Sequence, residues 1–209
     1  GFGIFSGAAY APGGVAAMFE KLESANRLND SGSFPYLRSH PLTVERIGDA
    51  RARVEAAKDP RALAPSAEHQ LMRARARVLM DPRAESLRRQ QASAADMHPS
   101  TTALDRMANH YASALASLQL REAAPALDAA KAADKALRAL PKADTEAERA
   151  VRLLTAQAMA LAGQTPQALA LLDAQADGAR AAVLTRASMA IDAARAGSPG
   201  AQQALRPSA

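Results

Sequence analysis

The chain has 209 residues, of which 55 are alanine and 3% are aromatic, and it contains neither cysteine nor tryptophan. Without cysteine it forms no disulfides and no thiolate-ligated zinc or iron–sulfur site, and charges interrupt every apolar run before the length of about 18 residues that a membrane-spanning helix needs. Alanine favours helix, and strand-forming residues are scarce, so the composition predicts an all-α fold.

The net charge of +5 arises from 26 basic and 21 acidic residues. Between residues 38 and 106, where basic residues are densest, Lys and Arg are interleaved with Asp and Glu, and Trp and Phe are missing. Single-strand nucleic-acid surfaces usually combine a basic groove with aromatic stacking. The pattern therefore does not predict a nucleic-acid partner, and a basic nucleic-acid-binding bundle is the weakest of the alternatives that we keep.

The first part of the chain predicts two helices separated by a loop. Pro12 suits a first helical turn, and apolar residues recur at intervals of three and four as far as Leu28. The segment 29–40 is rich in Asp, Ser, Gly and Pro and predicts a long loop. Pro41 then opens a second helix, which extends to about Lys58.

From Ser66 onward the pattern predicts antiparallel helix pairs. Ser66 can cap a helix that ends at Met80, and Pro82 opens a shorter helix to about Ala95. The further predicted helices are Thr102–Leu120, Ala123–Leu140, Thr145–Leu161, Pro166–Ala174, Gly178–Ala196 and Pro199–Leu205. Four helix pairs in about 140 residues are typical of an α-solenoid.

Small residues occur where the two helices of a pair are expected to cross. Ala114 and Ala126 are twelve residues apart, as are Ala156 and Ala168, and each pair spans a predicted turn. Tetratricopeptide repeats place small residues at this spacing, because only a small side chain lets the two backbones approach there. The two units are 42 residues apart rather than the usual 34, so the predicted array is tetratricopeptide-like but irregular. A generic α-helical bundle is the alternative.

The sequence contains no complete active site. None of the four histidines, at positions 40, 69, 98 and 110, lies in a His-Glu-x-x-His motif, and phosphate-binding loops and nucleophile elbows are missing. The segment from Ser39 to Ile47 is of interest, because it places His40 at the end of the long loop and Arg46 in the following helix. The alternative is that His40 has a structural role in the loop and Arg46 pairs with a surface carboxylate.

Two sequence elements together resemble a known family. The run GFGIFSGAAYAP at residues 1–12 and the pattern His40-Pro41 followed by Arg46-Ile47 are similar to the C-terminal half of CAAX-prenyl-protease-like (gluzincin) zinc metallopeptidases, in the bacterial branch with a tetratricopeptide domain. The resemblance implies that residues 1–58 are the tail of a catalytic domain and that residues 63–209 form the repeat domain. The zinc-binding motif and the glutamate ligand are then expected upstream, so this fragment alone should hold no zinc and be inactive.

For the intact parent, the resemblance implies Zn²⁺ as cofactor and a periplasmic role in quality control of envelope proteins. Arg46 is expected near the oxyanion of the scissile carbonyl, and His40 on the loop over the zinc as a supporting residue or an extra metal ligand. The repeat domain is expected to dock a protein partner or client, such as the outer-membrane assembly machinery. A non-enzymatic helical-repeat adaptor is the alternative.

Overall fold

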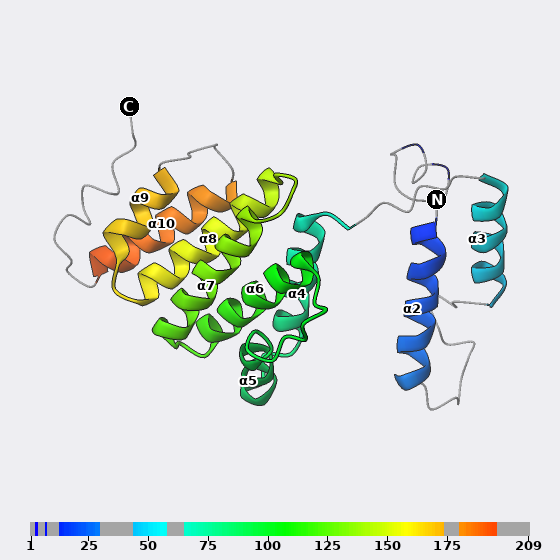
Figure 1. Ribbon diagram of the computed structural model, residues 1–209, viewed down its shortest axis with the longest axis horizontal. Helices are drawn as coiled ribbons and strands as arrows, with labels where there is room; N and C mark the ends of the chain where they lie inside the picture. Colours follow the sequence, from blue (N-terminus) through cyan, green and yellow to red (C-terminus); the bar gives the residue numbers. More distant parts are fainter. Residues whose placement is uncertain are drawn as a thin grey trace. The chain divides into compact units, whose positions relative to one another are not determined.

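The computed structural model describes residues 3, 7, 13–29, 44–57, 65–173 and 180–195, which form nine α-helices and no strand (Figure 1). This confirms the predicted all-α fold. The chain divides into two compact units, Gly1–Ala64 and Pro65–Ala209, which we describe separately. Among the described helices, none is both long enough and apolar enough to cross a lipid bilayer. The predicted helix over 199–205 lies outside the described residues.

In the first unit, helix α2 (Gly13–Asn29) packs against helix α3 (Val44–Ala57). Ala16 on α2 and Ile47 and Ala50 on α3 are buried. The Arg51 guanidinium donates two hydrogen bonds to Glu20 Oε1, at 2.9 Å from Nε and 2.6 Å from Nη2, which join the two helices.

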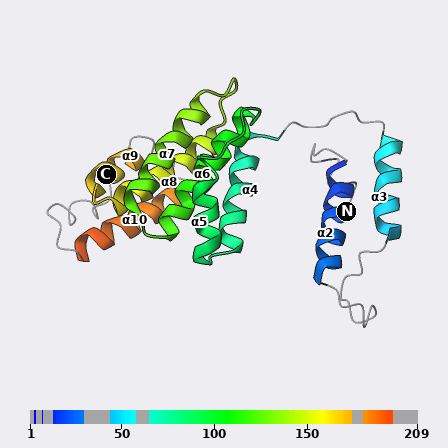
Figure 2. The same ribbon diagram turned by 60° about the horizontal axis from the view of Figure 1, so that its bottom comes forward.

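The second unit contains seven described helices, shown from two directions in Figures 1 and 2. They are α4 (Ala67–Met80), α5 (Ala84–Ala92), α6 (Ala103–Gln119), α7 (Ala123–Arg138), α8 (Thr145–Leu161), α9 (Thr165–Asp173) and α10 (Arg180–Arg195). From α6 to α10 each helix packs on the next, and α6 also contacts α8, as α8 contacts α10. The alternate helices α6, α8 and α10 are therefore neighbours.

Helix α4 departs from the simple pairing that the sequence predicts. It packs chiefly on α6 and α8, whereas α5 packs chiefly on α6. The buried side of α4 consists of Leu71, Ala74 and Val78 together with Ala67, and it joins the main core of the unit. This apolar stripe is covered more fully by two long helices than by the nine-residue α5.

Helices α6 and α8 are equivalent elements 42 residues apart. Both have 17 residues, and their N-cap residues, Thr102 and Asp144, lie at the same relative position. Each cap side chain accepts a hydrogen bond at 3.1 Å from a backbone N–H in the first turn, which satisfies a group that the helix itself leaves unpaired. The 42-residue spacing in the sequence is therefore also the spacing of the folded elements.

The two helices also end in the same way. Just beyond α6, Arg121 has φ 61°, and just beyond α8, Gly163 has φ 77°. In both turns the following residue donates a backbone hydrogen bond of 2.9 Å across the helix end, from Glu122 to Ser117 and from Gln164 to Met159. This is the Schellman arrangement, which places its C′ residue in the left-handed region and usually employs glycine.

The four alanines singled out in the sequence are fully buried. Ala114 lies on α6 and Ala126 on α7, whereas Ala156 lies on α8 and Ala168 on α9, and all four have 0% exposure. In each case the two helices concerned pack on each other. A larger side chain at such a position has no free space to enter without displacing its neighbours.

Candidate functional site

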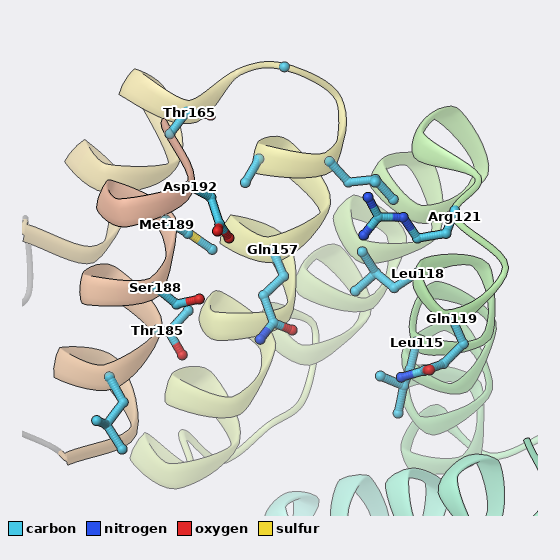
Figure 3. A pocket seen from close by; sticks show the side chains of 14 residues that line it. Leu115, Leu118, Gln119, Arg121, Gln157, Thr165, Thr185, Ser188, Met189 and Asp192 are labelled. Atoms are coloured by element: carbon cyan, nitrogen blue, oxygen red, sulfur yellow. The ribbon is translucent and has the colours of Figure 1, made fainter. Parts of the chain in front are cut away.

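A groove of about 910 Å³ opens between α6, α8 and α10 in the second unit (Figure 3). Its lining from α6 and α8 comes from four positions that recur at the 42-residue spacing. They are Leu115, Leu118, Gln119 and Arg121 from the first element, and Gln157, Ala160, Leu161 and Gly163 from the second. The same face of two equivalent helix-and-turn elements therefore forms adjoining walls of one groove.

Equivalent positions carry different chemistry. Gln119 corresponds to Leu161, and Leu115 corresponds to Gln157, so each wall presents one amide beside apolar side chains. Both amides are exposed, and neither forms a side-chain hydrogen bond within the part of the chain that the structure describes. An exposed amide next to apolar surface can bond both a backbone N–H and a backbone C=O of a bound chain.

Helix α10 completes the groove with both apolar and polar residues. Met189 is buried at the base, whereas Leu184 is 60% exposed. Thr185, Ser188 and Asp192 also line this wall, and Figure 3 shows the side chain of Asp192 directed from α10 toward the groove. Leu184 is a large apolar side chain at a solvent-facing groove, a feature common in interaction sites.

Arg121 enters the groove from the α6–α7 turn. Its side chain is exposed and points from the turn toward α8 and α10 in Figure 3. No carboxylate among the described residues pairs with it. Left-handed backbone costs an L-residue roughly 1–2 kcal/mol, so arginine is an unusual residue at a position where the equivalent element has Gly163.

Side chains from α5 hold this turn in place. Gln91 Nε2 donates to Ser117 Oγ at 2.9 Å and to Glu122 Oε2 at 2.7 Å. Arg88 Nη1 lies 2.5 Å from the other carboxylate oxygen of Glu122. The hydrogen bond from Gln91 and then the Arg88 guanidinium keep the pKa of Glu122 below its ordinary value, although burial opposes them. Ser117, in the last turn of α6, and Glu122, which follows Arg121, are thus held by α5.

The sequence did not identify Arg121 as a functional residue. It predicted a turn here, but the strongest signal for a left-handed residue is glycine, and this turn has none. The signal available was the 42-residue spacing, which aligns Arg121 with Gly163.

Of the two residues singled out in the first unit, only Arg46 is described. It lies on α3, its side chain is exposed, and it pairs with no carboxylate within the described residues, whereas Arg51 and Arg53 each bond one. His40 and the loop before it lie outside the described residues. The structure therefore does not test the expected proximity of His40 and Arg46.

The described residues do not form a zinc site. Nowhere in the described ranges do three His, Asp or Glu side chains gather as potential metal ligands. Within a turn, the backbone N–H of Ser100 donates a hydrogen bond of 3.2 Å to Nδ1 of His98. His110 is partly buried, and this burial, together with the nearby Arg106 charge, lowers its pKa. The contacts of His98 and His110 are thus those of a turn and of a partly buried helix face, which indicates a structural role for both.

Comparison with known proteins gives no match: no protein-family model, no curated protein and no solved structure is similar to this chain. The function is therefore inferred from the residues of the groove and from the geometry that brings them together. Among the described groove-lining residues there is no histidine and only one carboxylate. The other described lining residues are apolar, amide or hydroxyl side chains, together with Arg121 and Gly163.

Proposed function

We propose that the second unit is a docking module that binds a peptide segment of a partner protein in the groove between α6, α8 and α10. The observation that carries this proposal is the repetition of the lining. Four positions of one element and the same four positions of its 42-residue equivalent face a single groove. A surface built from successive equivalent helices suits an extended ligand, as in helical-repeat proteins.

The chemistry of the groove favours a peptide over a nucleic acid or a small metabolite. The described lining includes one arginine and one aspartate, so these charges cancel and leave no basic track for a phosphate backbone. The apolar residues Leu118 and Leu161 alternate with amides that have no partner among the described residues. A peptide supplies both apolar side chains and backbone hydrogen-bonding groups to such a surface.

The tetratricopeptide-like interpretation of the second unit is part of this proposal. It is supported by the buried alanine pairs, Ala114 with Ala126 and Ala156 with Ala168, and by the contacts between alternate helices. The repeat is irregular, because α4 contacts both α6 and α8. By the resemblance in sequence, the partner would be an envelope protein, either a client or a component of outer-membrane assembly.

The docking proposal can be tested by selecting random dodecapeptides, displayed on phage, against the full chain. A selected peptide is then titrated against two variants, Ser188→Trp and Ala187→Trp. Both positions are exposed on α10, but only Ser188 lines the groove. We expect the indole at position 188 to project into the groove and block the bound segment, and the indole at position 187 to leave the affinity unchanged. Equal binding to both variants, or no selectable peptide, would refute the proposal.

We further propose that the first unit belongs to the catalytic domain of a zinc metallopeptidase. What supports this is the resemblance in sequence, carried by residues 1–12 and by the pattern His40-Pro41 followed by Arg46-Ile47. Arg46 is exposed on α3. Zinc, when bound by the expected upstream residues, would activate a water molecule. The role assigned to Arg46 is to stabilise negative charge on the oxygen of the scissile carbonyl.

This second proposal requires the chain to be expressed together with the coding sequence upstream of it. Stoichiometric zinc and casein cleavage in the longer form would support the peptidase assignment. Arg46→Ala should then lower turnover about a hundredfold, the scale for loss of one oxyanion contact. Arg53→Ala is the matched control, since Arg53 is also exposed on α3 but bonds Asp49. Equal turnover in the two variants would refute the role of Arg46.

A further inference from the structure

The two charged side chains that line the groove come from the elements that flank α8. Arg121 belongs to the α6–α7 turn and Asp192 belongs to α10, and Figure 3 shows both directed toward the groove, with Gln157 of α8 between them. Both are exposed, and neither forms an ion pair or a side-chain hydrogen bond with any other described residue. The groove therefore has a positive end and a negative end.

The cation at one end is present despite a conformational cost. The Schellman turn that follows α8 uses Gly163 at the position where the turn after α6 has Arg121. Backbone of this kind is adopted more easily by glycine, so arginine here is a local conflict between sequence and conformation. Such conflicts are concentrated at functional sites.

The residues around Arg121 hold the backbone of this turn in place. Glu122, the next residue, is bonded by Gln91 and Arg88, and Ser117 in the last turn of α6 is bonded by Gln91. Because Arg88 and Gln91 already engage Glu122, that carboxylate is not among the partners of Arg121. The turn thus presents, on a held backbone, a guanidinium that has no carboxylate partner among the described residues.

From these charges we infer the partner's chemistry: the bound segment carries an acidic residue opposite Arg121, a basic residue opposite Asp192 and an apolar residue between them, in contact with Leu118, Leu161 and Met189. The inference rests on the proposed docking function and adds its specificity. Opposed charges fix the direction and register of a bound chain, since reversing the chain would place like charges together.

The test compares random-dodecapeptide selections on the full chain and on the double variant Arg121→Glu with Asp192→Arg. The double variant preserves the net charge of the chain while exchanging the positive and negative charges at the two ends of the groove. We expect peptides selected on the unmodified chain to share an acid, an apolar residue and a base in a fixed order, and those selected on the double variant to have the acid and the base exchanged. Both residues are exposed, and circular dichroism verifies that the variant remains helical.

Reversing the charge at one position alone gives a quantitative measure, which is the change in peptide affinity. Arg121→Glu should weaken a peptide selected on the unmodified chain about tenfold, and replacing the acidic residue of that peptide by lysine should restore the affinity. Arg73→Glu makes the same charge change at an exposed position of α4 outside the groove and should have no effect. Peptides that bind in the groove without any charge order would overturn this inference but leave the docking function standing. A failure to select any peptide that Ser188→Trp blocks would overturn both.

Discussion

The paired turns after α6 and α8 allow a reciprocal prediction about stability. Gly163 has φ 77°, and a Cβ added there would meet no atom within 4 Å, so Gly163→Ala changes conformational energy without causing a clash. The left-handed conformation costs alanine roughly 1–2 kcal/mol, and the reduced freedom of the unfolded chain returns about 0.4–1 kcal/mol. We expect Gly163→Ala to destabilise the second unit by about 1 kcal/mol. Arg121→Gly exchanges the same terms and should stabilise it by about 1 kcal/mol.

Thermal unfolding followed by circular dichroism measures both effects. In a unit of this size, 1 kcal/mol corresponds to a change in Tm of about 4 °C, downward for Gly163→Ala and upward for Arg121→Gly. Arg121→Ala is the control, because it removes the guanidinium but keeps the Cβ atom, and its Tm should be close to that of the unmodified chain. A fall in Tm for Arg121→Gly would refute the argument that arginine is retained here at a cost in stability.

Three further predictions concern the contacts that support the groove. Ser117→Ala removes a buried hydroxyl that accepts a hydrogen bond from Gln91, and should lower the free energy of unfolding by about 1 kcal/mol in urea titrations. Asp144→Ala removes the cap of α8 and a hydrogen bond from the backbone N–H of Glu68, and should cost about 1–2 kcal/mol in the same assay. The carboxylate of Glu122 has a lowered pKa, so the unfolded chain takes up its proton first; stability should fall as the pH drops below the ordinary value of 4.5, and Glu122→Gln should weaken this dependence. If the stability of that variant fell with pH below 4.5 as steeply as that of the unmodified chain, the assigned role of Glu122 would be contradicted.

Most of the described helices could be predicted from local sequence signals. Proline, capping residues and apolar periodicity placed α6 and α8 within a residue or two of their observed ends. These signals act within a few residues, so they do not require knowledge of the rest of the fold. The packing of α4 on both α6 and α8 was not predicted, because periodicity shows that a face is buried but does not identify the helix that covers it.

The sequence predicted that the repeat domain docks a protein, but it did not predict the groove between α6, α8 and α10. Its particular residues depend on which turns of α6, α8 and α10 adjoin, and this follows from long-range packing rather than from local pattern. Arg121 was missed because its left-handed conformation is set by the Schellman hydrogen bonds and the contacts from α5, not by its own preference. The prediction for Arg46 and His40 depended on a family resemblance, and it stays a prediction.

The most direct test of the docking function is site-specific photocrosslinking of a selected peptide to the full chain. A photoreactive residue that carries a small aliphatic diazirine, close in size to glutamine, is introduced at position 157, between the charged ends of the groove, or at position 73 on α4; both positions are exposed. We expect the peptide to crosslink at position 157 and not at position 73. A bound peptide that crosslinks at position 73, or equally at both, would show that the ligand occupies another surface and would refute the docking function.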